Sequence, residues 1–324
     1  MKEREKRAKN KAYTIDSKID ELDDLVKKLP FKLTLTQLKG VEEILNDLTN
    51  KRPMYRLLQG DVGSGKTIVA LLAALSVIKR GLKVVLMAPT SVLANQHFNT
   101  ANKFLGDIIR IGLLTGDKKV NEPFESDLLI ATHAVLYHKD EFVKDLALLI
   151  IDEQHRFGVE QRRALLELKN EYTPHLLHLT ATPIPRSIAL TLFGEIDVSV
   201  IEKPALRKVS ETKIVPNNKR EDSYSWIQDK IKEGGQVFWI CPLIEEGVNE
   251  NDDVIKVTQM YEDLNRIFPN IKKALLHGKM KDKDKQSILK EFEQNKVKIL
   301  VSTTVVEVGI DVPNANIMII ENAE

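Results

Sequence analysis

Short apolar runs alternate with longer amphipathic stretches through most of the chain. In the first part the runs lie at residues 56–58, 84–87, 108–114, 128–130, 146–151 and 176–179, and most of their residues are β-branched or leucine. Near-continuous apolar runs are typical of strands buried on both faces of a parallel sheet, and amphipathic spacers are typical of the helices that cover it. The pattern predicts an α/β fold with a doubly wound parallel sheet.

A second alternating set follows at residues 213–215, 237–241, 274–276, 298–301 and 317–320. A polar stretch with one proline, residues 201–208, separates the two sets and predicts a hinge. We therefore expect two α/β domains in tandem, at residues 31–203 and 204–324.

Residues 1–30 precede this pattern and are expected to form a basic tail and a helix. Residues 2–11 carry six basic and two acidic side chains, which is typical of a solvated tail. A helix is expected after the tail, because Ser17 with Asp20 fits a capping box, Pro30 marks an end, and apolar residues share one face. The apolar residues of that face are Ile15, Ile19, Leu22, Leu25 and Val26.

Composition narrows the class of protein. The 324 residues include 48 Lys and Arg and 47 Asp and Glu, which gives a formal net charge of +1. This balance excludes a uniformly basic, histone-like protein but allows a local basic groove that binds nucleic acid. The 43% of hydrophobic residues can form a sizeable core, which excludes global disorder.

The chain shows no sequence signal for export or membrane insertion. Its one cysteine, Cys241, allows no disulfide within the chain, which fits a reducing compartment. The longest apolar stretch, residues 68–78, is far shorter than the roughly 20 residues of a membrane helix. The N-terminus lacks the apolar core of a signal peptide. We therefore expect a cytoplasmic protein.

Residues 60–67 carry the clearest chemistry. They fit G-x-x-x-x-G-K-[ST] between an apolar run and a helix-like stretch, which is the setting that a phosphate-binding loop (P-loop) requires. Glycines let backbone N–H groups converge on phosphate oxygens, and the helix N-terminus adds a positive dipole. Lys66 would reach the β- and γ-phosphates, and the Thr67 hydroxyl would bind Mg²⁺. The motif consists of Gly60, Asp61, Val62, Gly63, Ser64, Gly65, Lys66 and Thr67.

Two acids follow the apolar run 146–151, at the strand end where open α/β sheets bind ligands. We expect Asp152 to hold Mg²⁺, directly or through water, and Glu153 to orient and deprotonate the attacking water. The alternative is an acid pair that faces solvent at a strand end. An upstream P-loop favours the catalytic interpretation.

Two further polar segments leave alternatives open. Thr180 and Thr182 follow a predicted strand and either couple the nucleotide to a second site or form a plain turn. Gln37 is either the third helical residue of a capping box begun by Thr34 or an amide that reads an adenine edge. The residues alone therefore support a two-domain P-loop NTPase and do not say what the nucleotide drives.

These motifs together resemble the superfamily 2 helicases and, within them, the motor of the RecG family. The segments that carry the resemblance are residues 56–67, 152–159, 180–182, 241–246, 276–280 and 302–313. It covers roughly residues 30–324 and implies two RecA-like domains, ATP and Mg²⁺ as cofactors, and branched or forked DNA as partner. The implied activity is that of a monomeric ATP-dependent DNA helicase that acts on replication forks and Holliday junctions in recombination and repair.

The transcription-repair coupling translocases are the alternative family. They share residues 180–186 and most of the acid box. Gln154, where that family tends to have a second glutamate, and residues 241–246 favour RecG.

The resemblance assigns roles to further residues by motif position. The resemblance implies that residues facing the nucleotide are Phe31 or Leu33, Gln37, Gly309 and Asp311. To coupling between the ATP and DNA sites it assigns His155, Thr180 and Thr182. To contact with the DNA backbone it assigns Pro89, Thr90, Gln96, His97, Thr115, Gly116, Thr132, His133, Thr303 and Thr304. Each threonine has the alternative role of a cap at a strand end, and His277 that of a packed core residue.

Six lysines lie close together between residues 272 and 285. They form either a solvated helix face or an edge that meets phosphates, and in the second case binding would depend on salt. The lysines are Lys272, Lys273, Lys279, Lys281, Lys283 and Lys285.

The sequence departs from the family at both ends. The family carries a wedge domain before the motor, where this chain has about 30 residues, and continues after residue 324 into a Gln-x-x-Gly-Arg motif that reaches the γ-phosphate. The resemblance therefore suggests an internal fragment of the motor with an incomplete second domain. Such a fragment would bind nucleotide, hydrolyse it near background, and prefer forks poorly.

Three hypotheses of function follow. The leading one is a RecG-type motor. The second is a module that binds nucleotide and DNA without turnover, which the expected loss of the arginine motif favours. The third is a P-loop NTPase that is not a helicase, against which residues 302–313 argue.

Overall fold

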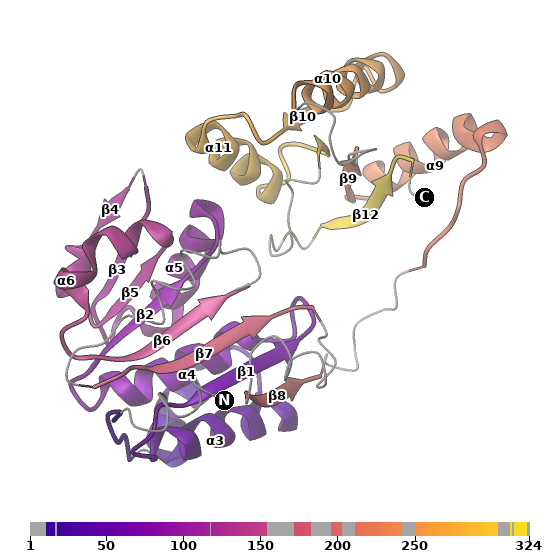
Figure 1. Cartoon of the computed structure of the whole chain (residues 1–324). Coiled ribbons are helices and arrows are strands. Elements are labelled where there is room, and N and C mark those ends of the chain that lie inside the picture. Colours follow the sequence, from indigo (N-terminus) through magenta and orange to yellow (C-terminus); the bar gives the residue numbers. More distant parts are fainter. Residues whose placement is uncertain are drawn as a thin grey trace. The chain divides into compact units, whose positions relative to one another are not determined.

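The computed structural model describes residues 11–16, 18–116, 118–153, 172–182, 196–202, 211–241, 250–303, 312 and 314–322. The chain divides into two compact units, Met1–Arg207 and Lys208–Glu324. Each is described by itself below, and Figure 1 labels their elements.

Unit 1 is built on an eight-stranded sheet with the order β4-β3-β5-β2-β6-β7-β1-β8. All of its pairings are parallel except that of β3 with β4. The strands are β1 (Tyr55–Gly60), β2 (Lys83–Met87), β3 (Ile111–Leu114), β4 (Lys119–Val120), β5 (Leu128–Ala131), β6 (Leu146–Asp152), β7 (His175–Thr180) and β8 (Asp197–Ile201). The doubly wound parallel sheet is confirmed, and a strand forms at each of the six predicted runs, although β3 begins only at Ile111 of the run 108–114. β4 and β8 were not predicted.

Both faces of this sheet are buried, as the continuous apolar runs require. Alternate residues of β2 enter two different cores, Val84 and Leu86 one and Val85 and Met87 the other. The first core is formed with α3 (Leu35–Leu48), α4 (Lys66–Ile78) and α5 (Ser91–Leu105), and the second with η3 (His133–His138) and α6 (Lys139–Phe142). Figure 1 shows α3 and α4 together on one side of the sheet.

The segment before the sheet packs into unit 1. It holds η1 (Ile19–Leu22) and α2 (Asp23–Lys28), so the predicted helix forms only in its second part, while Ser17 lies outside the described residues. Ile15 instead bonds through its backbone N–H to Leu48 O at 2.9 Å. The predicted apolar face is confirmed in part, because Ile15, Leu22 and Leu25 are buried in the first core.

Unit 2 contains a parallel four-stranded sheet with the order β10-β11-β9-β12. Its strands are β9 (Gln236–Ile240), β10 (Lys273–Leu276), β11 (Ile299–Ser302) and β12 (Ala315–Ile320), and its helices are η5 (Asn217–Lys219), α9 (Arg220–Lys232), α10 (Glu250–Ile267) and α11 (Asp282–Glu293). Four predicted strands are confirmed. The strand predicted at residues 213–215 is wrong: the segment pairs with no strand and Ile214 is 96% exposed.

None of the helices within the described ranges combines the length and apolar character that crossing a membrane requires. The described residues of unit 1 also include the short helix η2 (Pro123–Glu125).

Candidate nucleotide and DNA site

The P-loop lies between the end of β1 and the start of α4, as the motif predicted. Gly63 and Gly65 have φ angles of 75° and 89°, a region that favours glycine. At Gly60 a Cβ atom would come within 2.6 Å of Ser64 Oγ and 2.7 Å of the Ile201 carbonyl oxygen. Three glycines are therefore needed to close this loop.

Lys66 folds back over the loop. Its Nζ donates to Gly60 O at 2.6 Å and to Asp61 O at 3.1 Å. Burial lowers the pKa of this ammonium, while Asp152, Glu153 and Asp61 act in the opposite direction. These carboxylates therefore lie near enough to act on the Lys66 charge, which links the P-loop to the acid pair.

The acid pair sits at the tip of β6, and both side chains are buried. Asp152 Oδ2 lies 2.7 Å from His97 Nε2. Glu153 has a left-handed backbone with φ of 47°, which is uncommon for a residue other than glycine. Its backbone N–H donates to Leu179 O at 3.0 Å, so this turn is fixed against the end of β7.

Thr180 and Ala181, at the end of β7, hold the Glu153 side chain. Ala181 N–H donates to Glu153 Oε1 at 2.9 Å, and the Thr180 hydroxyl donates to Oε2 at 3.3 Å. The same hydroxyl accepts from Thr182 N–H at 3.2 Å. The segment predicted as either a coupling motif or a plain turn is thus bonded directly to the predicted water-activating carboxylate.

Gln37 joins the capping box to the P-loop. Thr34 Oγ1 accepts from Gln37 N–H at 3.2 Å and Thr34 N–H donates to Gln37 Oε1 at 2.9 Å, so the capping box is confirmed. The Gln37 amide also donates to Ser64 O at 2.7 Å. The structure does not test adenine reading by Gln37. Phe31 is 44% exposed and meets the edge of the Phe104 ring.

The strand ends predicted to contact DNA are neighbours along the same sheet edge. Residues 89 and 90 follow β2, residues 132 and 133 follow β5, and residues 115 and 116 follow β3. His133 and Gly116 are exposed, Pro89, Thr90 and Gln96 are half-buried, and Thr115, Thr132 and His97 are buried.

The threonines of these loops make local bonds that fit the capping alternative. Thr90 Oγ1 accepts from Leu93 N–H at 3.3 Å and so caps α5, and Thr132 Oγ1 lies 3.4 Å from Ala134 N. Thr115 Oγ1 lies 3.4 Å from Lys118 O. Their predicted DNA contacts stay predictions.

His97 differs most from its predicted place. It is 7% exposed, and its ring bonds Asp152, so this side chain lies with the acid pair and not on an open DNA-facing surface. Sequence reasoning missed this contact, because nothing in the spacing relates two residues that are 55 positions apart.

In unit 2, two of the predicted residues lie side by side at strand ends. His277 follows β10 and Thr303 follows β11, whose last residues Leu276 and Ser302 are paired. Thr303 Oγ1 and His277 Nδ1 are buried atoms without a hydrogen-bond partner among the described residues. Burial, Lys285 and Lys279 lower the pKa of His277.

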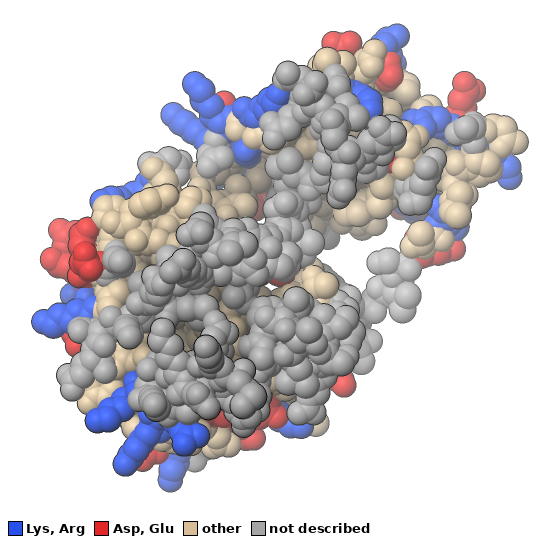
Figure 2. Space-filling view, in the orientation of Figure 1, with Lys and Arg blue, Asp and Glu red and all other residues tan. Residues whose placement is uncertain are grey.

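The six lysines do not act as one surface. Lys273 Nζ is committed to the carbonyl oxygens of Phe268 and Ile271, at 2.5 and 2.6 Å, and Lys272 pairs with Glu291 at 2.7 Å. Lys281 and Lys283 are exposed at the start of α11. Figure 2 shows basic side chains gathered over this helix. The predicted residues His155, Thr304, Gly309 and Asp311 lie outside the described residues.

The donor set suits Mg²⁺ held mainly by phosphates. Within the described ranges no group of three or more His, Cys, Asp or Glu side chains could hold a metal by itself. Mg²⁺ usually takes one or two carboxylates together with substrate phosphates. Asp152 and Thr67 beside a glycine loop fit that arrangement. Ser64 belongs to the same loop, and its buried Oγ has no partner in the described part of the chain.

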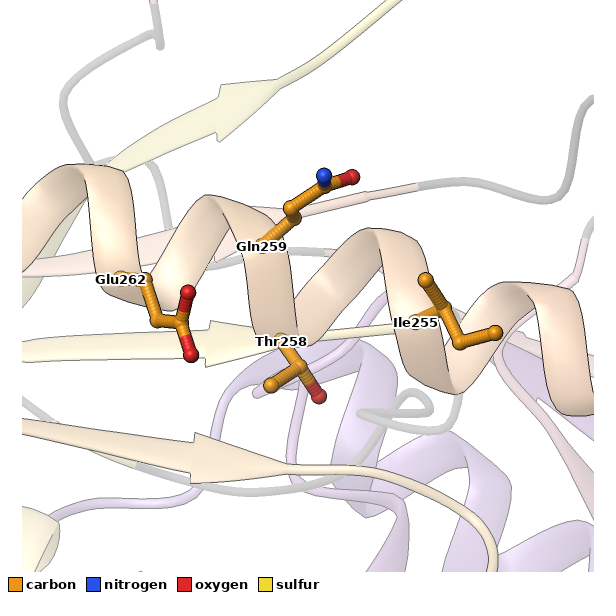
Figure 3. Close-up of a pocket in the computed structure, with 4 residues that line it drawn as sticks. All are labelled: Ile255, Thr258, Gln259 and Glu262. Atoms are coloured by element: carbon orange, nitrogen blue, oxygen red, sulfur yellow. The ribbon is translucent and has the colours of Figure 1, made fainter.

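A separate shallow hollow of about 280 Å³ lies along α10 of unit 2. Its lining consists of Ile255, Thr258, Gln259 and Glu262, all on one helix (Figure 3). Side chains from a single helix converge on no common point, so this hollow brings no chemistry together.

Each of the two units matches a known protein family. The DEAD/DEAH box helicase family matches residues 34–191, and the helicase conserved C-terminal domain matches residues 225–324. The chain is 45% identical over 330 residues to the ATP-dependent DNA helicase RecG of Aquifex aeolicus, which covers 98% of this chain and 41% of that protein. It is 43% identical over 314 residues to RecG of Escherichia coli K12, with 93% and 45% covered.

The solved structures that resemble this chain are also helicases. The structure of RecG bound to a three-way DNA junction superposes with a TM-score of 0.80 at 37% identity and covers 98% of this chain and 42% of that one. The DEAD-box helicase Mss116 bound to ssRNA shares the fold, with a TM-score of 0.69 at 19% identity. The chain spans less than half the length of the RecG relatives named above.

Proposed function

Because the chain belongs to the RecG family of helicases, we propose that it is the ATP-dependent motor of a DNA helicase or translocase that acts on branched DNA, as at forks and Holliday junctions in recombination and repair. The family members named above are ATP-dependent DNA helicases, and one of them was solved on a three-way junction. In this proposal residues 31–203 form the ATP-binding domain and residues 204–324 the C-terminal domain, with residues 1–30 as an N-terminal extension.

The observation that carries the proposal is the order of functions along one sheet edge. The P-loop, the acid pair and Thr180 follow β1, β6 and β7, which are neighbours. The loops assigned to DNA follow β2, β5 and β3, which continue the same edge. The unit 1 residues proposed for nucleotide and for DNA therefore lie along one edge of one sheet, which supports coupling of the two sites.

Each nucleotide-site residue has a proposed role. The P-loop backbone and the Lys66 ammonium bind phosphates, and Thr67 and Asp152 hold Mg²⁺, which when bound neutralises charge on the phosphates. Glu153 orients the attacking water and takes its proton. The bonds from Ala181 and Thr180 fix that carboxylate. His155, Thr180 and Thr182 are proposed to couple the ATP and DNA sites. Further nucleotide contacts are proposed for Phe31, Gln37, Gly309 and Asp311.

DNA is proposed to meet the protein through its backbone. The residues involved are Pro89, Thr90, Gln96, Thr115, Gly116, Thr132, His133, Thr303 and Thr304. Contacts of this kind read no base sequence, so binding is expected to be indifferent to sequence and dependent on salt. We also propose that the protein is a monomer. We place it in the cytoplasm, because a reducing compartment fits the single cysteine.

The test is whether nucleotide and DNA binding are linked. A fluorescent ADP analogue is titrated into the chain with Mg²⁺, alone, with plain duplex and with forked DNA. A motor predicts that DNA changes the nucleotide affinity, by about 5- to 150-fold for a typical coupling energy, and that nucleotide changes the DNA affinity by the same factor. Nucleotide binding that no DNA affects would contradict the proposal and favour a P-loop protein outside the helicases.

A further inference from the structure

The side chain of His97 contacts the acid that is proposed to hold Mg²⁺. His97 lies on α5 and Asp152 ends β6, and the distance from Nε2 to Oδ2 is 2.7 Å. Both residues are at least nine-tenths buried. A bond this short between buried groups fixes the carboxylate in one orientation.

The sheet order explains why α5 reaches this carboxylate. β2 pairs with β6, with Met87 beside Ile151, so the connection from β2 to α5 starts next to the end of β6. His97 is the seventh residue of α5, nearly two turns into the helix. On this turn of the helix, His97 faces the end of β6, where its ring contacts Asp152.

The chemistry of the pair sets the direction of the bond. A carboxylate that binds Mg²⁺ is ionised and can only accept hydrogen bonds, so the hydrogen belongs to His97 Nε2. The Asp152 carboxylate also acts on the Lys66 ammonium across the P-loop. The carboxylate therefore bonds the His97 ring directly and acts on the Lys66 ammonium through its charge.

We propose that His97 is a positioning residue for Asp152, which donates from Nε2 to Oδ2 and so presents the carboxylate to Mg²⁺ at the nucleotide phosphates. This positioning role replaces the DNA contact that the motif position of His97 implied. The inference rests on the proposed nucleotide site. Partners that orient a metal ligand typically change metal affinity by about 10- to 100-fold when they are removed.

A pair of variants separates the donor from the bulk of the side chain. In His97→Gln, the amide nitrogen lies the same number of bonds from Cα as the imidazole Nε2, so the donor is retained. His97→Met has nearly the shape of the Gln variant but no donor. Asn99→Ala, at an exposed position of the same helix, is the control for changes in α5.

The measurement is the Mg²⁺ concentration that half-saturates the increase in binding of a fluorescent ADP analogue, with the affinity in EDTA as reference and the thermal midpoint recorded for each variant. We expect His97→Met to raise that concentration about 10- to 100-fold, His97→Gln to stay within a few-fold of the parent chain, and the affinity in EDTA to stay unchanged. If His97→Met does not fold, His97→Asn, whose amide is too short to reach Oδ2, takes its place.

The outcomes distinguish failure of the proposed metal site from failure of the role of His97. A parent chain whose ADP binding does not respond to Mg²⁺ contradicts the proposed metal site itself. A parent chain that responds, with a His97→Met variant that responds at the same Mg²⁺ concentration, overturns the role of His97 alone. Equal losses in EDTA and in Mg²⁺ also overturn it, because they indicate packing and not metal positioning.

Discussion

Polar groups at the strand ends of the two units differ in whether they have hydrogen-bond partners among the described residues. In unit 1 the side chains at the sheet edge bond one another: Asp152 with His97, Glu153 with Thr180 and Ala181, and Gln37 with the P-loop. In unit 2 the buried hydroxyl of Thr303 and Nδ1 of His277 have no partner among the described residues. Unit 1 therefore presents a preorganised acid pair, while these two polar groups of unit 2 have no partner within the described ranges.

Preorganisation of this kind has an energetic signature. Groups that are already bonded need no reorganisation when charge develops in a transition state, so they favour catalysis. A buried hydroxyl without a partner instead lowers stability until something bonds it. Substitutions at Glu153, Thr180 and Thr303 test this contrast.

The largest effect is expected at Glu153. In Glu153→Gln the amide oxygen can accept from Ala181 N–H and the amide nitrogen can donate to the Thr180 hydroxyl, but the amide cannot take a proton. In a form of this chain that carries the Gln-x-x-Gly-Arg motif, we expect hydrolysis of bound ATP in a single turnover to slow by about 10²- to 10⁴-fold, as for the loss of a general base. ADP affinity should stay the same. A variant that hydrolyses ATP at the parent rate would show that another group activates the water.

The two buried threonines predict opposite changes in stability. Thr180→Val removes the hydroxyl that donates to Glu153 Oε2 and accepts from Thr182 N–H, and is expected to lower the free energy of unfolding by about 1–3 kcal/mol. Thr303→Val removes a buried hydroxyl that has no partner in the described residues, so it should be neutral or stabilising. Urea unfolding of both variants measures this. Equal losses would erase the contrast between the units.

His175 predicts a dependence of stability on pH. Its ring accepts from Met54 N–H at 2.9 Å and donates to Tyr13 O at 2.7 Å, which requires the neutral form, and burial lowers its pKa. The folded state therefore binds this proton less readily than the unfolded state. The stabilising contribution is complete above the ordinary histidine pKa of about 6.5 and is lost as pH falls below it, with a slope of up to about 1.4 kcal/mol per pH unit.

The check is a series of unfolding curves between pH 7.5 and pH 5 for the parent chain and His175→Gln, which retains a donor toward Tyr13 but does not titrate. The difference in stability between the two should shrink as pH falls. A constant difference would mean that His175 does not titrate on unfolding.

The smallest effect is expected from single lysines of unit 2. Lys283 is exposed on α11, so Lys283→Ala should reduce the slope of log affinity for DNA against log salt by about 1 if it meets a phosphate. Lys273→Met should leave that slope unchanged, because the Lys273 ammonium is committed to Phe268 O and Ile271 O. Titrations at several salt concentrations give both slopes. An unchanged slope for Lys283→Ala would favour a solvated helix face.

Much of this architecture follows from local pattern. The six predicted strands of unit 1 formed because continuous apolar runs must be covered on both faces, and the P-loop and the Thr34 capping box formed because their geometry depends on residues close in sequence. The strand predicted at residues 213–215 is wrong, because a run with only two apolar residues, Ile214 and Val215, does not specify a partner strand. β8 was missed because exposed and buried residues mix along it.

The contacts that complete the site depend on tertiary structure, which a single sequence does not reveal. His97 with Asp152 and His175 with Tyr13 join residues 55 and 162 positions apart. A histidine on a predicted helix or strand carries no mark of its partner. The roles of Phe31, Gln37 and the DNA-facing loops stay predictions for the same reason, since they concern ligands and not the chain itself.

The central claim is that unit 1 binds nucleotide through the P-loop with Lys66 on the phosphates. Calorimetric titration of ADP with Mg²⁺ into the parent chain, Lys66→Ala and the surface control Lys230→Ala tests it most directly. Loss of a charge-assisted bond of about 1.5–3 kcal/mol predicts that Lys66→Ala binds roughly 10- to 100-fold more weakly, while Lys230→Ala binds like the parent. Equal ADP affinity in all three proteins would contradict the account.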